Sequence, residues 1–344
     1  MDVRLITGLD YVAAVLHGRR SRMAEGERLA GLCAGRSIGE LARALYGETA
    51  IASAVELQKR LILDRATELL ELGKKLEGPA AGLLGWMAVR FQVENLKVLA
   101  RGLASHTPPS EVQGHLVPLP GDLAVDARAL AAGAAVETLV EVIKQPALRD
   151  AVVAALPLVR AHPRSFFLEA ALDRGYFTEL LARAEAVAGD DREDVLTLVR
   201  QEIDLFHLAL VARGRFHYAL PAEQVTPFYV PGTALGWKDF RAMLAAADLA
   251  EAAAKAVRLV IDKAPQTADA AALERAAWDR FHRLAAAIFR RSQTGLGLLV
   301  AYVALRRVEL ANLIAASEGI RAGMSVDDLR RRMVPRPHAE ARRV

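Results

Sequence analysis

The chain has 344 residues, of which 53% are hydrophobic and 6% aromatic, and 45 basic against 41 acidic residues give it a formal net charge of +4. This mixed charge argues against a nucleic-acid-binding surface, which would concentrate basic residues on one face. The longest uncharged run, residues 292–305, is shorter than the roughly 20 apolar residues of a membrane-spanning helix.

The predicted elements are nearly all helices, because Ala and Leu are abundant and aromatic residues are few. In chain order, we expect helices at residues 5–34, 37–46, 56–76, 81–101, 125–143, 147–159, 165–188, 192–213, 237–246, 251–261, 268–290 and 295–321. A short strand is expected at 215–220. The basic group Arg19, Arg20 and Arg22 is expected to form a solvated face of the first helix.

One helix pattern occurs three times, with a polar residue in the middle of an apolar face. The polar residues are Asn95, His207 and Asn312, and each is followed seven residues later by a glycine, namely Gly102, Gly214 and Gly319. A mid-helix Asn costs a few tenths of a kcal/mol relative to Ala, and a buried amide must find partners. We therefore expect these polar side chains to form specific hydrogen bonds, and the glycines to end their helices in the left-handed conformation. The first two copies are expected to close with equivalent turns at 119–121 and 230–232.

The spacing of the polar residues indicates a threefold repeat of roughly 110 residues. The predicted fold is all-α, with three pseudo-threefold-related helical domains forming a funnel. The predicted domains are residues 1–116, 117–232 and 233–335. Residues 336–344 are a basic tail that is expected to be disordered.

Three motifs resemble sites of chemistry. Residues 35–39 match the G-x-S-x-G nucleophile elbow, but Ser37 and Glu40 fit a capping box that opens a helix. Residues 190–194 match the D-D-x-x-D motif of class I isoprenoid synthases, although Gly189 ends one helix and the acids open the next. Asp204 and His207 share a helix face, where a structural hydrogen bond is favoured over a metal site. We therefore expect no catalytic, cofactor-binding or metal-binding residues.

Two features of the sequence indicate the compartment. The amino terminus has no apolar run typical of a signal peptide. The one cysteine, Cys33, excludes an intramolecular disulfide and is expected to be buried, as suits a reducing compartment. We expect a cytoplasmic protein that is at most peripheral to a membrane.

Several short motifs together resemble the C subunit of the V/A-type rotary ATPases, which is similar to the d subunit of eukaryotic vacuolar ATPases. Glu94-Asn-Leu-Lys97 with Arg101-Gly102 resembles that family's recurring acid–Asn-Leu–basic helix. Residues 297–302 and Asn312-Leu313 resemble its last repeated helix, and residues 41–47 resemble its Leu-…-Tyr-Gly ending near the amino terminus. The resemblance extends from about residue 8 to 333. It departs from the family pattern at His207, which replaces Asn, and at Glu318, which replaces a basic residue.

The resemblance implies a non-catalytic rotor subunit, monomeric within its complex, on the cytoplasmic face of the membrane proteolipid ring. The central-stalk coiled-coil subunit and its small companion would enter the funnel, so that the rotor subunit transmits torque for ATP synthesis and proton or other ion transport. No cofactor, nucleic acid or small-molecule substrate is implied. Arg330, Arg331 and Arg332 are candidate ring contacts. An isoprenoid-synthase-like enzyme and a generic helical scaffold remain alternatives.

Overall fold

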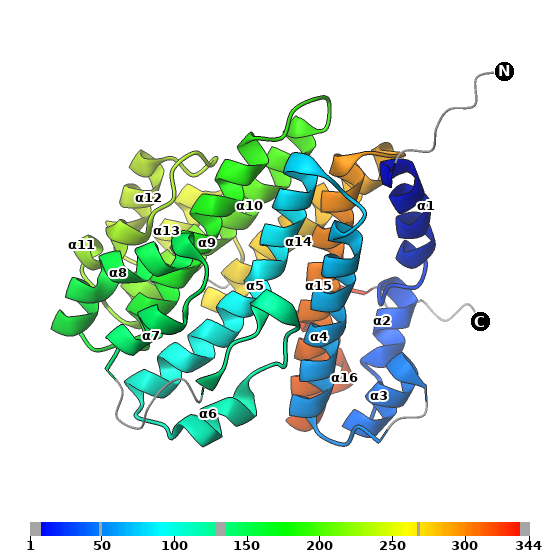
Figure 1. Cartoon of the computed structure of the whole chain (residues 1–344), viewed down its shortest axis with the longest axis horizontal. Helices are drawn as coiled ribbons and strands as arrows, with labels where there is room; N and C mark the ends of the chain where they lie inside the picture. Colours follow the sequence, from blue (N-terminus) through cyan, green and yellow to red (C-terminus); the bar gives the residue numbers. More distant parts are fainter. Residues whose placement is uncertain (1–7, 48–49, 128–134, 267–268, 338–344) are drawn as a thin grey trace. The chain divides into compact units, whose positions relative to one another are not determined.

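The structure is a computed structural model that describes residues 8–47, 50–127, 135–266 and 269–337. In these ranges it is all-α, as predicted, and its only β-structure is an isolated bridge between Val257 and Ile261 (Figure 1). The α-helices are α1 (Gly8–Arg20), α2 (Gly26–Leu32), α3 (Ile38–Tyr46), α4 (Ala54–Gly73), α5 (Gly78–Ala104), α6 (Pro109–His115), α7 (Glu137–Val142), α8 (Pro146–Ala161), α9 (Ser165–Glu185), α10 (Arg192–Leu210), α11 (Ala222–Val225), α12 (Trp237–Leu244), α13 (Leu249–Ala256), α14 (Ala270–Arg291), α15 (Leu296–Arg321) and α16 (Val326–Arg332). Two 3-10 turns, η1 (Gly121–Leu123) and η4 (Thr226–Phe228), and a π-helix, η3 (Val211–His217), complete the regular structure.

The helices form two compact units. The first unit comprises Met1–Glu68 with Phe281–Val344, and the second comprises Leu69–Arg280. None of the helices in the described ranges is long and apolar enough to cross a bilayer.

In the first unit, α15 packs against α1, α3 and α16. Leucines from five helices fill the core between these elements, including Leu29, Leu41, Leu61, Leu313 and Leu329. Helices α4 and α15 run side by side (Figure 1), and their contact includes polar groups. This core holds the polar groups described below in fixed positions, because buried side chains of this kind occupy single rotamers at high packing density.

In the second unit, α9 is the central helix and packs against α5, α8 and α10. It is buried on most sides because it carries large apolar residues all around its circumference, among them Phe167, Leu172 and Tyr176. The indole Nε1 of Trp86 on α5 donates a hydrogen bond of 2.9 Å to the carbonyl oxygen of Tyr176. An aromatic side chain with a satisfied polar tip thus joins the two longest helices of this unit.

Four predicted elements differ from the structure by more than three residues or in kind. The strand expected at 215–220 is wrong, because residues 211–217 continue α10 as a π-helix. The single helix expected at 5–34 is divided into α1 and α2, and the break leaves the Ala24 N–H free to donate to Glu309 Oε1 at 2.6 Å. In the range expected as a helix at 125–143, the structure has α7 only, and residues 128–134 lie outside the described residues. Helix α13 ends at Ala256, five residues before the predicted end.

The capping interpretation of Ser37 is confirmed. Its hydroxyl oxygen accepts the Glu40 N–H at 3.1 Å at the start of α3. The Glu40 carboxylate accepts the N–H of Arg36 at 2.8 Å, one residue before the position that a capping box would use. Ser37 therefore opens a helix after a turn. A nucleophile elbow would require a strand before this serine, and Ser37 does not follow one.

Candidate functional site

Each repeated helix is tied by its mid-helix polar residue to the segment that follows it, which we name the return segment (105–118, 218–231 and 322–335). In the first copy, Asn95 Nδ2 donates to the Val117 carbonyl oxygen at 2.8 Å, and the Val117 N–H donates to Asn95 Oδ1 at 3.0 Å. In the third copy, Asn312 makes the same two bonds with Val334, at 2.6 and 3.0 Å. Both amides are buried. One side chain thus satisfies both backbone polar groups of a buried valine, which would otherwise be left unpaired.

His207 performs the equivalent task in the second copy with different chemistry. The Val230 N–H donates to His207 Nε2 at 3.0 Å, so Nε2 is unprotonated and Nδ1 carries the hydrogen. Nδ1 lies 3.3 Å from Asp204 Oδ1. The Asp204 carboxylate also accepts the backbone N–H groups of Ala234 and Leu235, at 3.1 and 3.3 Å. Both ring nitrogens therefore have partners within the protein, as expected for a structural histidine.

The partner of each polar residue is a valine that precedes a proline: Val117-Pro118, Val230-Pro231 and Val334-Pro335. The closing turns were predicted to be equivalent at 119–121 and 230–232, and this alignment is wrong by two residues. The residue that corresponds to Val230 is Val117, because each donates its N–H to the polar residue of its repeated helix. A proline at the next position favours an extended backbone in the valine, which presents its N–H and C=O to the helix. A Val-Pro pair 22 or 23 residues after each polar residue was the signal in the sequence that could have found this register.

The predicted role of the glycines is wrong. Gly102 and Gly319 lie inside their helices, two residues before the last helical residue, and neither has a positive φ. They allow the short helix of the return segment to pack closely. A Cβ on Gly102 would lie 2.5 Å from a methyl group of Val112 on α6, and one on Gly319 would lie 2.6 Å from a methyl group of Leu329 on α16. Gly214 is the equivalent residue in the second copy, where a Cβ would lie 3.0 Å from Val225 on α11.

The left-handed conformation that was predicted for the glycines is found a few residues after each of them. His106, Ala219 and Gly323 have φ values of 54°, 52° and 67°. The first and third lie four residues after the glycine of their copy, and Ala219 lies five residues after Gly214. The second copy therefore contains one additional residue, and it lies where the helix becomes the π-helix η3. A π-turn accommodates a single inserted residue without changing what precedes or follows it.

Each repeated helix also makes polar side-chain contacts with a long helix that precedes another repeated helix in the sequence. Helix α9 holds α5, because Asp173 pairs with Arg90 and Lys97, both at 2.7 Å, and Glu169 pairs with Arg101 at 3.2 Å. These are polar contacts between neighbouring helices with three cations on α5 and two acids on α9.

The same relationship recurs for the other two repeated helices. Helix α14 holds α10, since Arg280 Nε donates to Gln201 Oε1 at 3.0 Å. Helix α4 holds α15, since Gln58 Nε2 donates to Ser317 and Glu318 at 2.8 and 2.6 Å. The order of contacts is therefore cyclic. Helix α9, which precedes the second repeated helix, contacts the first. Helix α14, which precedes the third, contacts the second, and helix α4, which precedes the first, contacts the third.

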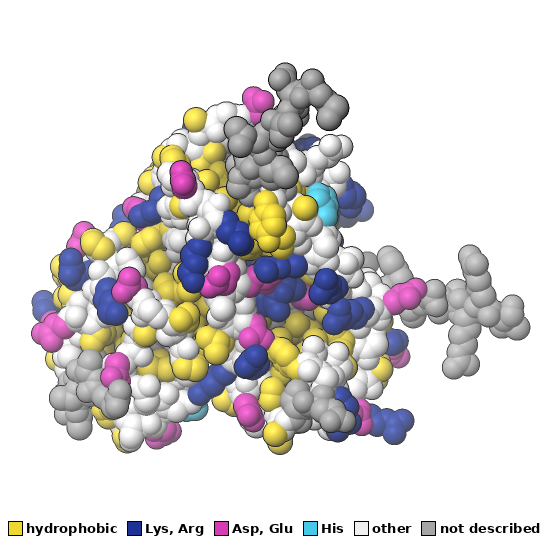
Figure 2. Space-filling model, turned by 45° about the vertical axis from the view of Figure 1, so that its right-hand side comes forward, with side chains coloured by type: hydrophobic (Ala, Val, Ile, Leu, Met, Phe, Trp, Pro, Cys, Tyr) yellow, Lys and Arg dark blue, Asp and Glu magenta, His cyan; other side chains and the backbone are white. Residues whose placement is uncertain are grey.

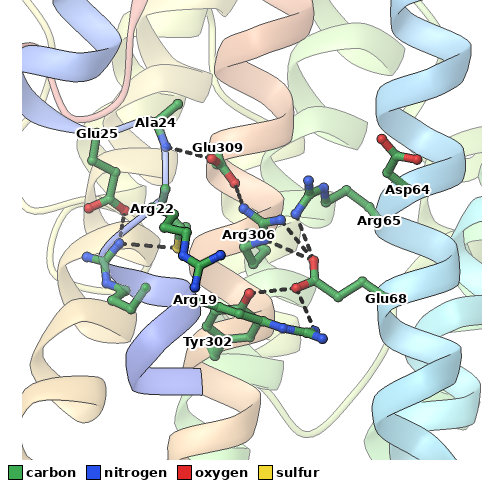
Figure 3. A network of polar contacts seen from close by, with 12 residues as sticks. Arg19, Arg22, Ala24, Glu25, Asp64, Arg65, Glu68, Tyr302, Arg306 and Glu309 are labelled. Atoms are coloured by element: carbon green, nitrogen blue, oxygen red, sulfur yellow. Dashed lines mark hydrogen bonds and ion pairs between the residues drawn. The ribbon is translucent and has the colours of Figure 1, made fainter. Parts of the chain in front are cut away.

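Glu68 on α4 is the centre of a charge network within the first unit (Figure 3). Its Oε1 accepts hydrogen bonds from Arg19 Nη1 at 3.0 Å and from the Tyr302 hydroxyl at 2.7 Å. Its Oε2 accepts from Arg65 Nη1 at 2.7 Å and from Nε and Nη2 of Arg306 at 3.0 and 2.9 Å. Burial and the neighbouring carboxylate raise the pKa of Tyr302, so its hydroxyl remains a donor. Five donors exceed the roughly four lone-pair positions of a carboxylate, so Glu68 has no acceptor capacity left.

A cavity of about 270 Å³ opens beside this network. Its cationic lining consists of Arg19, Arg22, Arg28, Arg65 and Arg306. The prediction of a solvated basic face is only partly confirmed, because Arg22 is exposed, whereas Arg19 and Arg20 are half-buried and pair with Glu68 and Glu25. Sequence reasoning missed this cavity, because Glu68 and Arg306 lie far in the sequence from Arg19.

The remaining predicted residues have less specific surroundings. Arg330 Nη2 donates to the Ala30 carbonyl oxygen at 3.2 Å, and Arg331 pairs with Asp328. Arg332 is exposed on α16, without a hydrogen bond or ion pair in the described part of the chain. Cys33 is buried as predicted, and burial raises the pKa of its thiol to about 11. The predicted disorder beyond Pro335 concerns a tail that, from residue 338, lies outside the described residues.

The acidic motif at 190–194 surrounds the start of α10. Gly189 has a φ of +88°, α10 begins at Arg192, and Asp194 lies in its first turn. Acids in a first helical turn are stabilised by the helix dipole, by about 0.3–1 kcal/mol each. Among the described residues, no group of three metal-ligating side chains is present at this or any other place.

Two comparisons with known proteins agree with the resemblance. The sequence model of the ATP synthase (C/AC39) subunit family matches residues 12–332, a range that contains all three repeated helices. The C subunit of the A-type ATP synthase of Methanosphaera stadtmanae has 22% identical residues over 319 residues, which cover 88% of this chain and 81% of that protein. The resemblance to the C subunit of the V/A-type ATPases is thereby confirmed, and the chain belongs to the ATP synthase C/AC39 subunit family.

Proposed function

We propose that this chain is the non-catalytic rotor subunit that couples the central stalk to the membrane proteolipid ring in a V/A-type ATPase or ATP synthase. It would lie on the cytoplasmic face of the membrane as a peripheral component, one copy per complex. Its partners would be the coiled-coil stalk subunit with its small companion and the proteolipid ring. Its task would be the transmission of torque for ion transport and ATP synthesis.

The observation that carries this proposal is the cyclic order in which α9, α14 and α4 hold the three repeated helices. Three equivalent modules linked in this order support a funnel with pseudo-threefold symmetry, with domains at 1–116, 117–232 and 233–335. A funnel of this kind has an axial opening for a stalk, whereas an enzyme needs a pocket with reactive groups. In this proposal the function depends on the shape of the surface that receives the stalk, and not on reactive groups in a pocket.

A torque-transmitting subunit must resist deformation, and the repeated contacts fit that requirement. Asn95, His207 and Asn312 each fix a return segment to its helix through buried hydrogen bonds. Buried polar networks that are fully satisfied rigidify a structure, because any displacement leaves a desolvated group unpaired. The return segments are therefore held in one position relative to the helices that they follow.

The two interfaces should differ in chemistry. A specific complex with the stalk needs at least about 1,000 Å² of buried surface. The ring is symmetric and this chain repeats only approximately in threes, so most ring protomers would meet a different part of its surface. We therefore expect a dispersed, mainly polar contact with the ring, in which Arg330, Arg331 and Arg332 take part. Exposed charge pairs are screened within about 8–10 Å at ordinary ionic strength, so the ring contact should be the more salt-sensitive one.

Co-expression with the cognate stalk coiled-coil subunit and its companion tests the proposal. We expect a 1:1:1 complex that survives moderate salt in gel filtration, and binding to detergent-solubilised ring that weakens as salt rises. Arg332→Glu should weaken ring binding and leave the stalk complex intact. The control Arg149→Glu changes an exposed arginine of α8 in the second unit and should affect neither contact. A chain that ignores the stalk pair at every salt concentration would overturn the proposal.

A further inference from the structure

We propose that the cavity beside Glu68 is an anion-binding site that takes a phosphate group. The inference is separate from the proposed function, since it rests on the charges and the volume of a cavity within the first unit. The space-filling view shows basic side chains gathered around acidic ones near the middle of the face that it draws (Figure 2).

The charges that line the cavity are unbalanced. Five arginines face two carboxylates, those of Glu68 and Glu309, so the lining carries three more positive than negative charges. Both carboxylates are also occupied. Glu68 accepts five donors, and Glu309 accepts the Ala24 N–H through Oε1 and pairs with Arg306 through Oε2. The excess charge must therefore be neutralised by an anion from outside the described residues or by bulk solvent.

The unused donors lie at the edge of the cavity. The guanidinium of Arg22 is exposed and has no hydrogen bond or ion pair within the described ranges. Arg28 is also exposed and uses one Nη1 hydrogen on the Arg22 carbonyl oxygen. Arg65 and Arg306 are held rigidly by Glu68, with side chains only 19% and 16% exposed. The site therefore combines two arginines that Glu68 holds in place, Arg65 and Arg306, with two exposed ones, Arg22 and Arg28.

The composition of the lining favours phosphate. Every cation in it is an arginine, whose planar fork binds phosphate oxygens in pairs and stays charged at every physiological pH. Leu45, Leu61 and Leu313 form its apolar part, and a low-dielectric wall strengthens the attraction between ions. A single water molecule occupies about 30 Å³ in the liquid. A volume of about 270 Å³ therefore accommodates a phosphate or diphosphate group with a few waters.

Such a group has two sources, a soluble phosphate compound and the head group of a phospholipid. Isothermal titration of the full chain with pyrophosphate tests the first source. Flotation with phosphatidylcholine vesicles, with and without phosphatidic acid, tests the second. The double variant Arg22→Gln/Arg28→Gln removes the two exposed arginines of the cavity, and the control Arg36→Gln/Arg149→Gln removes two exposed arginines elsewhere.

We expect the native chain and the control to bind at least one of these probes, and the Arg22/Arg28 variant to bind it at least tenfold more weakly. Hydrogen exchange on the native chain provides a second measurement that needs no variant: the bound probe should slow exchange in α2 and around Arg306. Binding of pyrophosphate alone identifies a soluble ligand, and binding of phosphatidic acid vesicles alone identifies a lipid head group. The proposal is overturned if neither probe binds, if the two double variants lose binding equally, or if only an acidic peptide competes for the site.

Discussion

Asn312 and Val334 are joined by two hydrogen bonds between the side-chain amide of Asn312 and the backbone C=O and N–H of Val334, at 2.6 and 3.0 Å. The two residues are 22 positions apart, and the same arrangement joins Asn95 to Val117. A side-chain amide carries a donor NH₂ beside an acceptor oxygen, so it can donate to the carbonyl oxygen and accept from the N–H of the same residue. In the first and third copies, one side chain therefore fixes the valine of the return segment to the repeated helix.

The first prediction concerns these amides. Asn95→Leu and Asn312→Leu should each lower the free energy of unfolding by about 1–3 kcal/mol, because the N–H and C=O of the partner valine stay buried without a partner. Denaturant titration followed by circular dichroism measures the change. Asn95→Asp keeps the acceptor but opposes a carboxylate to the Val117 carbonyl oxygen, so it should also destabilise the protein. Midpoints at or above that of the parent, with an unchanged fold, would contradict the structural role.

The second prediction concerns close packing at Gly102. Gly102→Ala should destabilise the protein by about 1–3 kcal/mol, the usual cost of overpacking, because the added methyl would lie 2.5 Å from Val112. Gly85→Ala is the matched control in the same helix, where no atom lies within 4 Å of the added methyl. It should be neutral or stabilising by up to about 1 kcal/mol.

A second substitution separates packing from other effects of Gly102→Ala. Val112→Ala in the Gly102→Ala background removes the methyl groups that clash and should recover part of the loss. Thermal melting of the four proteins forms a double-mutant cycle. Simple additivity of the two substitutions would show that the glycine is not required for the approach of α6.

The third prediction concerns the hydrogen of His207. Because Nε2 accepts the Val230 N–H at 3.0 Å, the ring should be neutral with its hydrogen on Nδ1. Nitrogen-15 NMR of histidine-labelled protein distinguishes the two tautomers by their chemical shifts and couplings. His217, which is not buried, serves as the reference in the same spectrum. A hydrogen on Nε2 of His207 would be incompatible with the bond to Val230.

The fourth prediction concerns pH. Burial raises the pKa of Glu309, although the Ala24 N–H and Arg65 act against this shift. A raised pKa means that the folded protein holds this proton more tightly than the unfolded chain, so the contribution of Glu309 to stability decreases as pH rises from its ordinary value of 4.5 through the folded pKa. Glu309→Gln keeps an acceptor for Ala24 and removes the titration.

Urea titrations of the parent and Glu309→Gln across mildly acidic to neutral pH measure this contribution as a difference. The parent should lose stability relative to the variant as the pH rises through this window. A difference between the two proteins that is constant over the whole range would show that Glu309 does not titrate differently in the folded state.

The sequence predicted the helices well because their evidence is local. Long apolar periodicity at 81–101 and 295–321 determined α5 and α15 nearly to their ends, and a serine followed by glutamate three residues later identified the start of α3. The break between α1 and α2 could not be predicted, because the group that holds Ala24 belongs to Glu309, 285 residues away.

The candidate sites were predictable only in part. The three polar residues were recognisable because each interrupts an apolar face at the same position. Their partner in the first copy was predicted two residues out of place, because Leu119-Pro-Gly121 matches Val230-Pro-Gly232 more closely than Val117-Pro118-Leu119 does. The cavity beside Glu68 had no signal in the sequence, since Arg19, Arg65 and Arg306 belong to three helices that the fold brings to one carboxylate.

The π-helix at 211–217 also bears on which changes of chain length this protein tolerates. A deletion of one residue within 215–218, after Gly214, should restore the spacing of the other two copies and leave the bond between His207 and Val230 intact. A deletion between Asn95 and Gly102 would instead rotate every later residue of α5 by about 100°, and Gly102 would no longer face Val112. Insertions and deletions in relatives of this chain should therefore collect after the glycine of each copy, and the seven-residue interval before it should keep a constant length.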